Sequence, residues 1–196
     1  MIMAWILAAC FFLLSAWSIY SYNRLVTMKN DVKNAWSAID VQLKRRHDLI
    51  PGIVEFVKGY ATHERQTLDT VIKARQAAMA SSGDPEARAK AEKALSASLL
   101  PLLALAEAYP NLKASENFIA LQNELAATEN KIGFARLYYN DTATRYKNRI
   151  EKFPGNIVAG FFNFRAEPFF QLTEASERAA LQIKSGALAA NKRSEV

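Results

Sequence analysis

The chain has 196 residues, of which 51% are hydrophobic and 22% are charged, and its formal net charge is +6 at pH 7. This length suits one domain of ordinary size, and the composition excludes a largely disordered chain. A single cysteine and two histidines exclude an internal disulfide bond and a zinc site built from these residues alone. Helix-forming residues such as Ala, Leu, Glu, Lys and Arg recur throughout, so we predict an all-α protein.

Residues 1–23 form the first predicted element. They contain no charged side chain, and about 20 apolar residues are enough to cross a bilayer as a helix. A removable signal peptide would have a cationic start and a shorter apolar run. We therefore predict a transmembrane helix that stays on the protein as an anchor.

Cys10 follows Leu7-Ala8-Ala9, a sequence that resembles a bacterial lipobox. Lipidation would make Cys10 the N-terminus of the mature chain. Only nine residues precede it, none of them basic, and the apolar run continues beyond it. We therefore favour the alternative, in which Cys10 is a small side chain within the membrane span.

The end of the apolar segment has the residue types found at membrane surfaces. Aromatic rings suit the headgroup level, and the first cations of the chain follow them. Because no Lys or Arg precedes the span, the charge bias predicts a cytoplasmic C-terminal domain and an N-terminus outside. The cations can also contact anionic lipid. The predicted membrane-interface residues are Trp17, Tyr20, Tyr22, Arg24, Lys29 and Lys33.

Residues 25–43 carry apolar side chains at helical spacing and lead into the basic cluster 44–47. Cations suit the C-terminus of a helix, Asp48 suits the N-cap of the next one, and Pro51 suits its first turn. We favour a tight reversal of the chain at Asp48. The alternative is one long helix that is kinked at Pro51.

The basic cluster has two interpretations. Arg46 lies 22 residues beyond Arg24, which is about 33 Å along a helix and too far for contact with the same bilayer. We favour a structural role, with pairing to the helix dipole and to Asp40 or Asp48. The alternative is an acidic surface on another protein. The candidate partner contacts are Lys44, Arg45 and Arg46.

Three further helices are predicted. The second covers residues 49–80, and the third starts at the capping pair Asp84-Pro85 and ends near Tyr109. The longest follows Pro110 and has apolar residues at intervals of seven, which predicts a coiled-coil-like seam. The seam residues are Phe118, Leu125, Ile132, Tyr139, Tyr146 and Phe153.

With a reversal at Asp48, the helices form an antiparallel four-helix bundle, which we place at residues 24–172. A phenylalanine-rich segment then returns to the membrane side, whereas one continuous first helix would place it far away. This segment is a candidate membrane-interface or oligomer contact, and the alternative is packing over the open end of the bundle. We expect a polar, flexible tail at 173–196. The candidate contacts are Phe161, Phe162, Phe164, Phe169 and Phe170.

The sequence contains no recognisable catalytic set. His63-Glu64 does not continue into an HExxH motif because residue 67 is Thr, and there is no Glu-x-x-His pair or glycine-rich phosphate loop. We therefore expect no catalytic, cofactor-binding or metal-binding residues. The cations form no continuous stripe interleaved with aromatic residues, so nucleic-acid binding is not expected either.

Three segments together resemble the LemA family of bacterial membrane-anchored proteins. They are NDVKNAWSAIDVQLKRRHDLIPGIVEFVKGYATHE (30–64), YPNLKASENFIALQNELAATENKI (109–132) and ARLYYNDTATRYKNRIEKFPGN (135–156). The resemblance implies a single-pass protein of the bacterial inner membrane, with the N-terminus outside, a cytoplasmic helical bundle and no established enzymatic activity. Some family members take part in magnetosome membrane formation and others occur beside a membrane metalloprotease, which implies a role in envelope maintenance or membrane remodelling.

We accordingly predict a membrane-tethered helical scaffold that acts by binding and assembles as a homo-oligomer. Its expected partners are membrane lipid and an unidentified membrane or cytoplasmic protein. The alternative is a membrane-shaping protein that acts through its phenylalanine-rich segment and its juxtamembrane cations.

Overall fold

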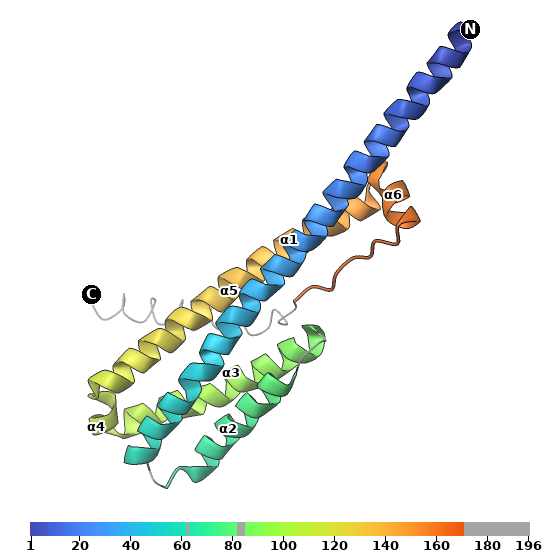
Figure 1. The fold of residues 1–196 in the computed structure, drawn as a ribbon. Coiled ribbons are helices and arrows are strands. Elements are labelled where there is room, and N and C mark those ends of the chain that lie inside the picture. Colours follow the sequence, from blue (N-terminus) through green and yellow to red (C-terminus); the bar gives the residue numbers. More distant parts are fainter. Residues whose placement is uncertain (62, 82–84, 171–196) are drawn as a thin grey trace, which may run out of the picture.

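A computed structural model describes residues 1–61, 63–81 and 85–170 (Figure 1). Within these residues it contains helices and no strand, which confirms the all-α fold class. The apolar N-terminal part of the first helix projects beyond a helical bundle, as predicted (Figure 1). The helices are α1 Ile2–Tyr60, α2 Arg65–Ala80, α3 Pro85–Ala108, α4 Pro110–Lys113, α5 Glu116–Glu151 and α6 Gly155–Phe161.

The helices α1 and α5 lie side by side in antiparallel directions and form the most extensive helix–helix contact of the bundle (Figure 1). Five predicted seam residues of α5 are buried, namely Phe118, Leu125, Ile132, Tyr139 and Tyr146. The prediction for Phe153 is wrong, because α5 ends at Glu151 and the Phe153 side chain is 80% exposed. Apolar residues at intervals of seven keep one face of α5 packed against one face of α1.

The predicted reversal at Asp48 is wrong, because α1 continues through Pro51 to Tyr60. Proline has no backbone N–H, so Pro51 cannot donate to the carbonyl of His47, four residues earlier. In its place the side-chain Nε–H of Arg75, from α2, donates to the His47 carbonyl at 2.7 Å. The helix therefore keeps this carbonyl hydrogen-bonded without changing direction.

The chain reverses after Tyr60, so the predicted second helix is divided between the end of α1 and α2. The number of reversals before α5 is unchanged, and α5 still runs back towards the membrane end of α1 (Figure 1). The expectation that a continuous helix through Pro51 would carry the aromatic segment far from the membrane is therefore wrong. The predicted capping residue Asp84 lies outside the described residues.

The hydrophobic core has two parts. The distal part, at the end away from the N-terminus, joins α1, α2, α3, α4 and α5. The proximal part is built mainly from α1, α5 and α6, because the α2–α3 hairpin lies beside the distal part of α1 (Figure 1). The four long helices α1, α2, α3 and α5 therefore pack together in the distal part, with the short α4 beside them.

Residues 164–170 cover the proximal core as an extended segment that runs back from α6 (Figure 1). The Tyr139 hydroxyl donates to the carbonyl of Pro168 at 2.7 Å, and the Asn140 side chain exchanges two hydrogen bonds with the backbone of Phe170. Phe170 is buried, and its ring centroid lies 5.7 Å from that of Trp36. The predicted tail, 173–196, lies outside the described residues.

Candidate functional site

The N-terminal part of α1 is the one described helix that is long and apolar enough to cross a membrane. None of its most apolar window is buried against the rest of the protein. Large apolar side chains are exposed on all sides of it, including Trp5, Phe11, Phe12 and Leu14. A helix that is apolar around its whole circumference needs an apolar surrounding. Cys10 is a free, exposed cysteine within this segment.

The helix α6 packs against α1 at the point where the uncharged segment ends. The ring of Phe162 lies 4.6 Å from that of Tyr22, and the ring of Phe164 lies 5.7 Å from it, centroid to centroid. Tyr22 precedes Arg24, the first charged side chain of the chain, by two residues. The end of the bundle is therefore level with the end of the apolar segment.

Exposed apolar side chains from α6 and from the end of α5 lie beside α1 at this level. Phe153 is 80% exposed, Ile157 60% and Phe161 83%, although each follows or lies within a packed helix. Soluble surfaces rarely group large apolar residues in this way unless they contact a membrane or another protein. We call this surface the apolar collar. It consists of Tyr20, Tyr22, Phe153, Ile157, Phe161 and Phe162.

The other residues predicted at the membrane surface have different surroundings. Trp17 is partly buried and packs against the proximal core. Arg24 and Lys33 are exposed, whereas Lys29 is half-buried. Lys33 lies nine residues beyond Arg24, about 14 Å along the helix. Of these cations, Arg24 is thus nearest to the end of the apolar segment.

The phenylalanine-rich segment does not act as one surface. Phe161 and Phe162 are exposed in the collar, whereas Phe164 and Phe169 are partly buried against the proximal core. Phe170 is 2% exposed. Of the five phenylalanines, Phe161 and Phe162 are therefore the two that remain accessible to an external partner.

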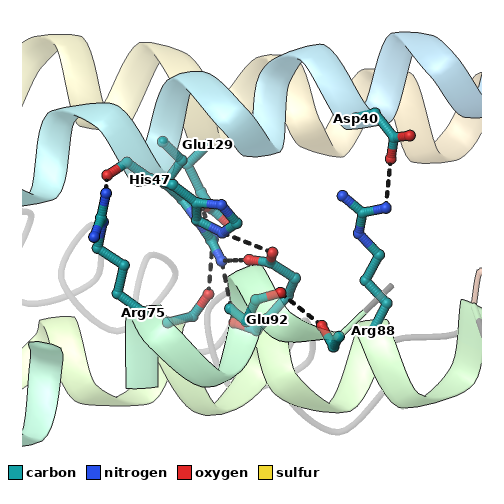
Figure 2. Close-up of polar contacts among 10 residues, drawn as sticks. Asp40, His47, Arg75, Arg88, Glu92 and Glu129 are labelled. Carbon is teal, nitrogen blue, oxygen red and sulfur yellow. Dashed lines mark hydrogen bonds and ion pairs between the residues drawn. The ribbon is translucent and has the colours of Figure 1, made fainter. Parts of the chain in front are cut away.

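The basic cluster is divided between the surface and the interior. Lys44 is exposed, and Arg45 forms an exposed ion pair with Glu124. Arg46 is 1% exposed and forms a buried ion pair with Glu92 of α3. The pairing predicted with Asp40 is wrong, because Asp40 pairs with Arg88 at 2.7 Å (Figure 2). The helix-end dipole interpretation is also wrong, because α1 continues past this cluster.

The buried cluster connects three helices (Figure 2). Arg46 Nη1–H donates to Glu129 of α5 at 2.6 Å and to the Ser96 hydroxyl of α3 at 3.0 Å. His47 Nε2 lies 2.8 Å from the Glu92 carboxylate. Burial by itself would raise the pKa of Glu92, but the hydrogen bond with His47 and the charge of Arg46 outweigh burial and hold this pKa below its ordinary value.

The positions of Arg46 and Glu92 in the sequence indicate their burial. Arg46 continues the series Leu25, Val32 and Ile39, which are seven residues apart and buried. Glu92 lies three residues from both Ala89 and Leu95 on the apolar face of α3. A charged residue in such a position needs a partner of opposite charge. The structural role favoured for Arg46 had Asp40 or Asp48 as its expected partner, and Glu92 was not predicted.

The cluster provides structural support and has no feature of a catalytic centre. Its three central side chains are at most 7% exposed, so a substrate has no access to them. Among the described residues, no group of three or more His, Cys, Asp or Glu side chains is placed to hold a metal ion.

Comparisons with known proteins identify relatives over most of the chain. "Protein LemA" of Metamycoplasma hominis is 26% identical over 152 residues, which cover 78% of this chain and 69% of that protein. "Magnetosome protein MamQ 2" of Paramagnetospirillum magneticum is 24% identical over 181 residues, which cover 80% of this chain and 66% of that protein. "Magnetosome protein MamQ" of Magnetospirillum gryphiswaldense is 23% identical with the same coverage.

The chain thus spans about two thirds of the length of these relatives. The model that describes the LemA family matches residues 35–184, which include the buried ion cluster and α6. Together with the apolar N-terminal helix, these relatives identify a membrane-associated helical protein. The chain belongs to the LemA family.

Proposed function

We propose that this chain is a non-catalytic protein of the bacterial inner membrane that acts by binding, and that its apolar collar inserts into the membrane surface around its own anchor. The bundle then lies on the cytoplasmic side, as the cations after the span favour. The observation that carries this proposal is the contact between Tyr22 and Phe162, because it holds α6 level with the end of the apolar segment.

Insertion of the collar would act on the bilayer as a wedge. Apolar side chains at a membrane surface enter the boundary between headgroups and acyl chains. Phe161 and Ile157 belong to a helix fixed against the anchor, so they would enter only one leaflet. A one-sided insertion favours curved membrane. The magnetosome proteins named MamQ among its relatives are consistent with a function at membranes.

The depth of position 161 in a bilayer tests the proposal. The full chain with Cys10→Ser and Phe161→Cys carries one fluorophore at position 161, and proteoliposomes containing spin-labelled lipids report its depth. We expect strong quenching at position 161. The matched control is Phe134→Cys, which is 73% exposed on α5. Phe134 lies farther from the end of the apolar segment than Tyr139, whose ring contacts Trp36. Trp36 is itself about 18 Å along α1 from Arg24, so a label at position 134 should not be quenched.

The functional consequence is tested with the variant Ile157→Ser/Phe161→Ser. Both side chains are at least 60% exposed, so we expect the bundle to stay folded. The proposal predicts fewer curved or tubular proteoliposomes by electron cryomicroscopy than with the unchanged protein. Equal quenching at positions 161 and 134, or unchanged membrane shape in this variant, would contradict it.

A second candidate function is self-assembly as a scaffold, and one surface favours it. Phe134, Leu137 and Tyr138 are 73%, 69% and 59% exposed and occupy one face of α5. A disulfide crosslinking test in membranes uses Leu137→Cys in the Cys10→Ser protein. Efficient dimer formation at position 137, but not at the exposed control Lys93→Cys of α3, is expected if copies meet at this face. Equal crosslinking at both positions would argue against it.

A further inference from the structure

A pocket of about 420 Å³ opens between α1 and α5 beside the collar. One wall is formed by Tyr20, Arg24 and Met28, which are four residues apart and share a face of α1. The facing wall comes from the last two turns of α5 and the residues that follow them. It is lined by Arg145, Asn148, Arg149, Lys152 and Phe153.

The pocket has a strong excess of positive charge. Four of its eight lining residues are cations, and none is acidic. Arg145 pairs with Asp141, four residues earlier on α5, at 2.8 Å. For Arg24, Arg149 and Lys152 the described residues provide no ion pair, and the buried Nε of Arg149 has no hydrogen-bond partner.

The positive charges that line the pocket repel one another. Arg145 and Arg149 are four residues apart on one helix, and like charges at this spacing destabilise a helix. Arg24 adds a third positive charge from the opposite wall. An anion in the pocket would relieve this repulsion. Arg side chains favour phosphate in particular, because their planar N–H groups match its oxygens in pairs.

The location of the pocket favours the headgroup of a phospholipid as the phosphate it would bind. Tyr20 and Arg24 mark the end of the apolar segment, so the pocket lies at the level of lipid headgroups. Below it, Leu13 and Phe12 are exposed seven and eight residues before Tyr20, on the same face of α1. A phospholipid whose phosphate lies in the pocket can therefore place its acyl chains along this face of α1.

We propose that this pocket binds the phosphate of an anionic phospholipid, held by Arg24 from α1 and by Arg145, Arg149 and Lys152 from α5. The inference rests on the membrane anchor of the proposed function but not on insertion of the collar. A lipid bound there would connect the end of α5 to the anchor, and thereby fix the bundle relative to the membrane surface.

The test uses the full chain in detergent micelles and measures bound lipid by native mass spectrometry. The variant Arg24→Gln/Arg145→Gln/Lys152→Gln changes three exposed side chains and leaves Arg149 in place. The matched control, Lys73→Gln/Lys90→Gln/Lys93→Gln, removes the same charge from exposed positions on α2 and α3. Circular dichroism verifies that both are folded.

We expect the unchanged protein and the control to bind phosphatidylglycerol more tightly than phosphatidylcholine. The pocket variant should bind phosphatidylglycerol at least about tenfold more weakly. Equal losses in the variant and the control would overturn the proposal, as would equal affinity for the two lipids. Displacement of the lipid by millimolar glycerol 3-phosphate would instead assign the pocket to a soluble phosphate ester and overturn the lipid assignment. Quenching at position 161 in phosphatidylcholine membranes reports separately on the collar.

Discussion

Arg46 and Glu92 form an ion pair whose side chains are only 2% and 5% exposed. The pair joins α1 to α3 at the level where α5 contributes Glu129. Two charges lose their hydration when they are buried, and their attraction compensates for this only while both are present. The pair therefore makes correct docking of three helices a condition for a stable interior.

The first prediction concerns the loss of one partner. Glu92→Ala leaves Arg46 and His47 without their buried carboxylate, and we expect the free energy of unfolding to fall by about 3–5 kcal/mol. Urea unfolding followed by circular dichroism measures it. The control Glu124→Ala removes the exposed partner of Arg45 and should cost about 1 kcal/mol or less. Similar losses in the two variants would show that the buried pair has no special weight.

The second prediction concerns acid. The pKa of Glu92 lies below its ordinary value of 4.5, because its hydrogen bond with His47 and the charge of Arg46 outweigh the effect of burial. Such a carboxylate stabilises the fold at pH values above 4.5, and this contribution is lost as the pH falls through the lower pKa of the folded chain. Other carboxylates also titrate there, so the comparison with Glu92→Gln isolates this group. Urea midpoints between pH 6 and pH 3 should fall less steeply in Glu92→Gln. Equal slopes would refute the assignment.

The third prediction concerns Pro51 and Arg75. Arg75→Met removes the donor to the His47 carbonyl and should destabilise the chain by about 1–3 kcal/mol. Pro51→Ala restores a backbone N–H for the same carbonyl. In the Pro51→Ala background, Arg75→Met should therefore cost clearly less. A double-mutant cycle from urea unfolding measures this coupling, and additive effects of the two changes would contradict it.

The contrast between Pro51 and the α5 seam shows what can be predicted from a sequence. The seam is a seven-residue repeat within one continuous stretch of sequence, so Leu125, Ile132 and Tyr139 could be assigned to the buried face. The continuation of α1 past Pro51 depends on Arg75, which is 24 residues away in sequence and on another helix. A local pattern of cap and proline cannot reveal a donor of this kind, so the favoured interpretation was the wrong one.

The site was predictable in its location but not in its members. The charge boundary at Arg24 placed the membrane end, and Phe161 and Phe162 were among the candidate contacts. Which aromatic residues remain exposed depends on how residues 164–170 pack, and this buries Phe170 against Trp36. The pocket beside the collar combines residues about 120 positions apart, and only the antiparallel pairing of α1 and α5 brings them together.

The fourth prediction concerns the segment that covers the proximal core. Asn140 Nδ2–H donates to the carbonyl of Phe170 at 3.2 Å, and the Phe170 N–H donates to Asn140 Oδ1 at 3.0 Å. The neighbouring Tyr139 hydroxyl donates to Pro168, and burial together with the charge of Glu167 raises the pKa of Tyr139 to about 12. This hydroxyl is therefore protonated near neutral pH and already donates to Pro168, so it is not free to replace the side-chain amide of Asn140.

Asn140→Ala should consequently release the end of this segment first. Each unpaired group costs about 1–3 kcal/mol when it stays buried, so local opening becomes more frequent. Hydrogen exchange at the Phe170 amide should accelerate by at least about tenfold, because 1.4 kcal/mol corresponds to a factor of ten. Exchange in the distal core should not change, since that core does not contact the segment. Asn130→Ala, at an exposed position on α5, is the control, and equal protection of Phe170 in both variants would show that packing of its ring alone holds the segment in place.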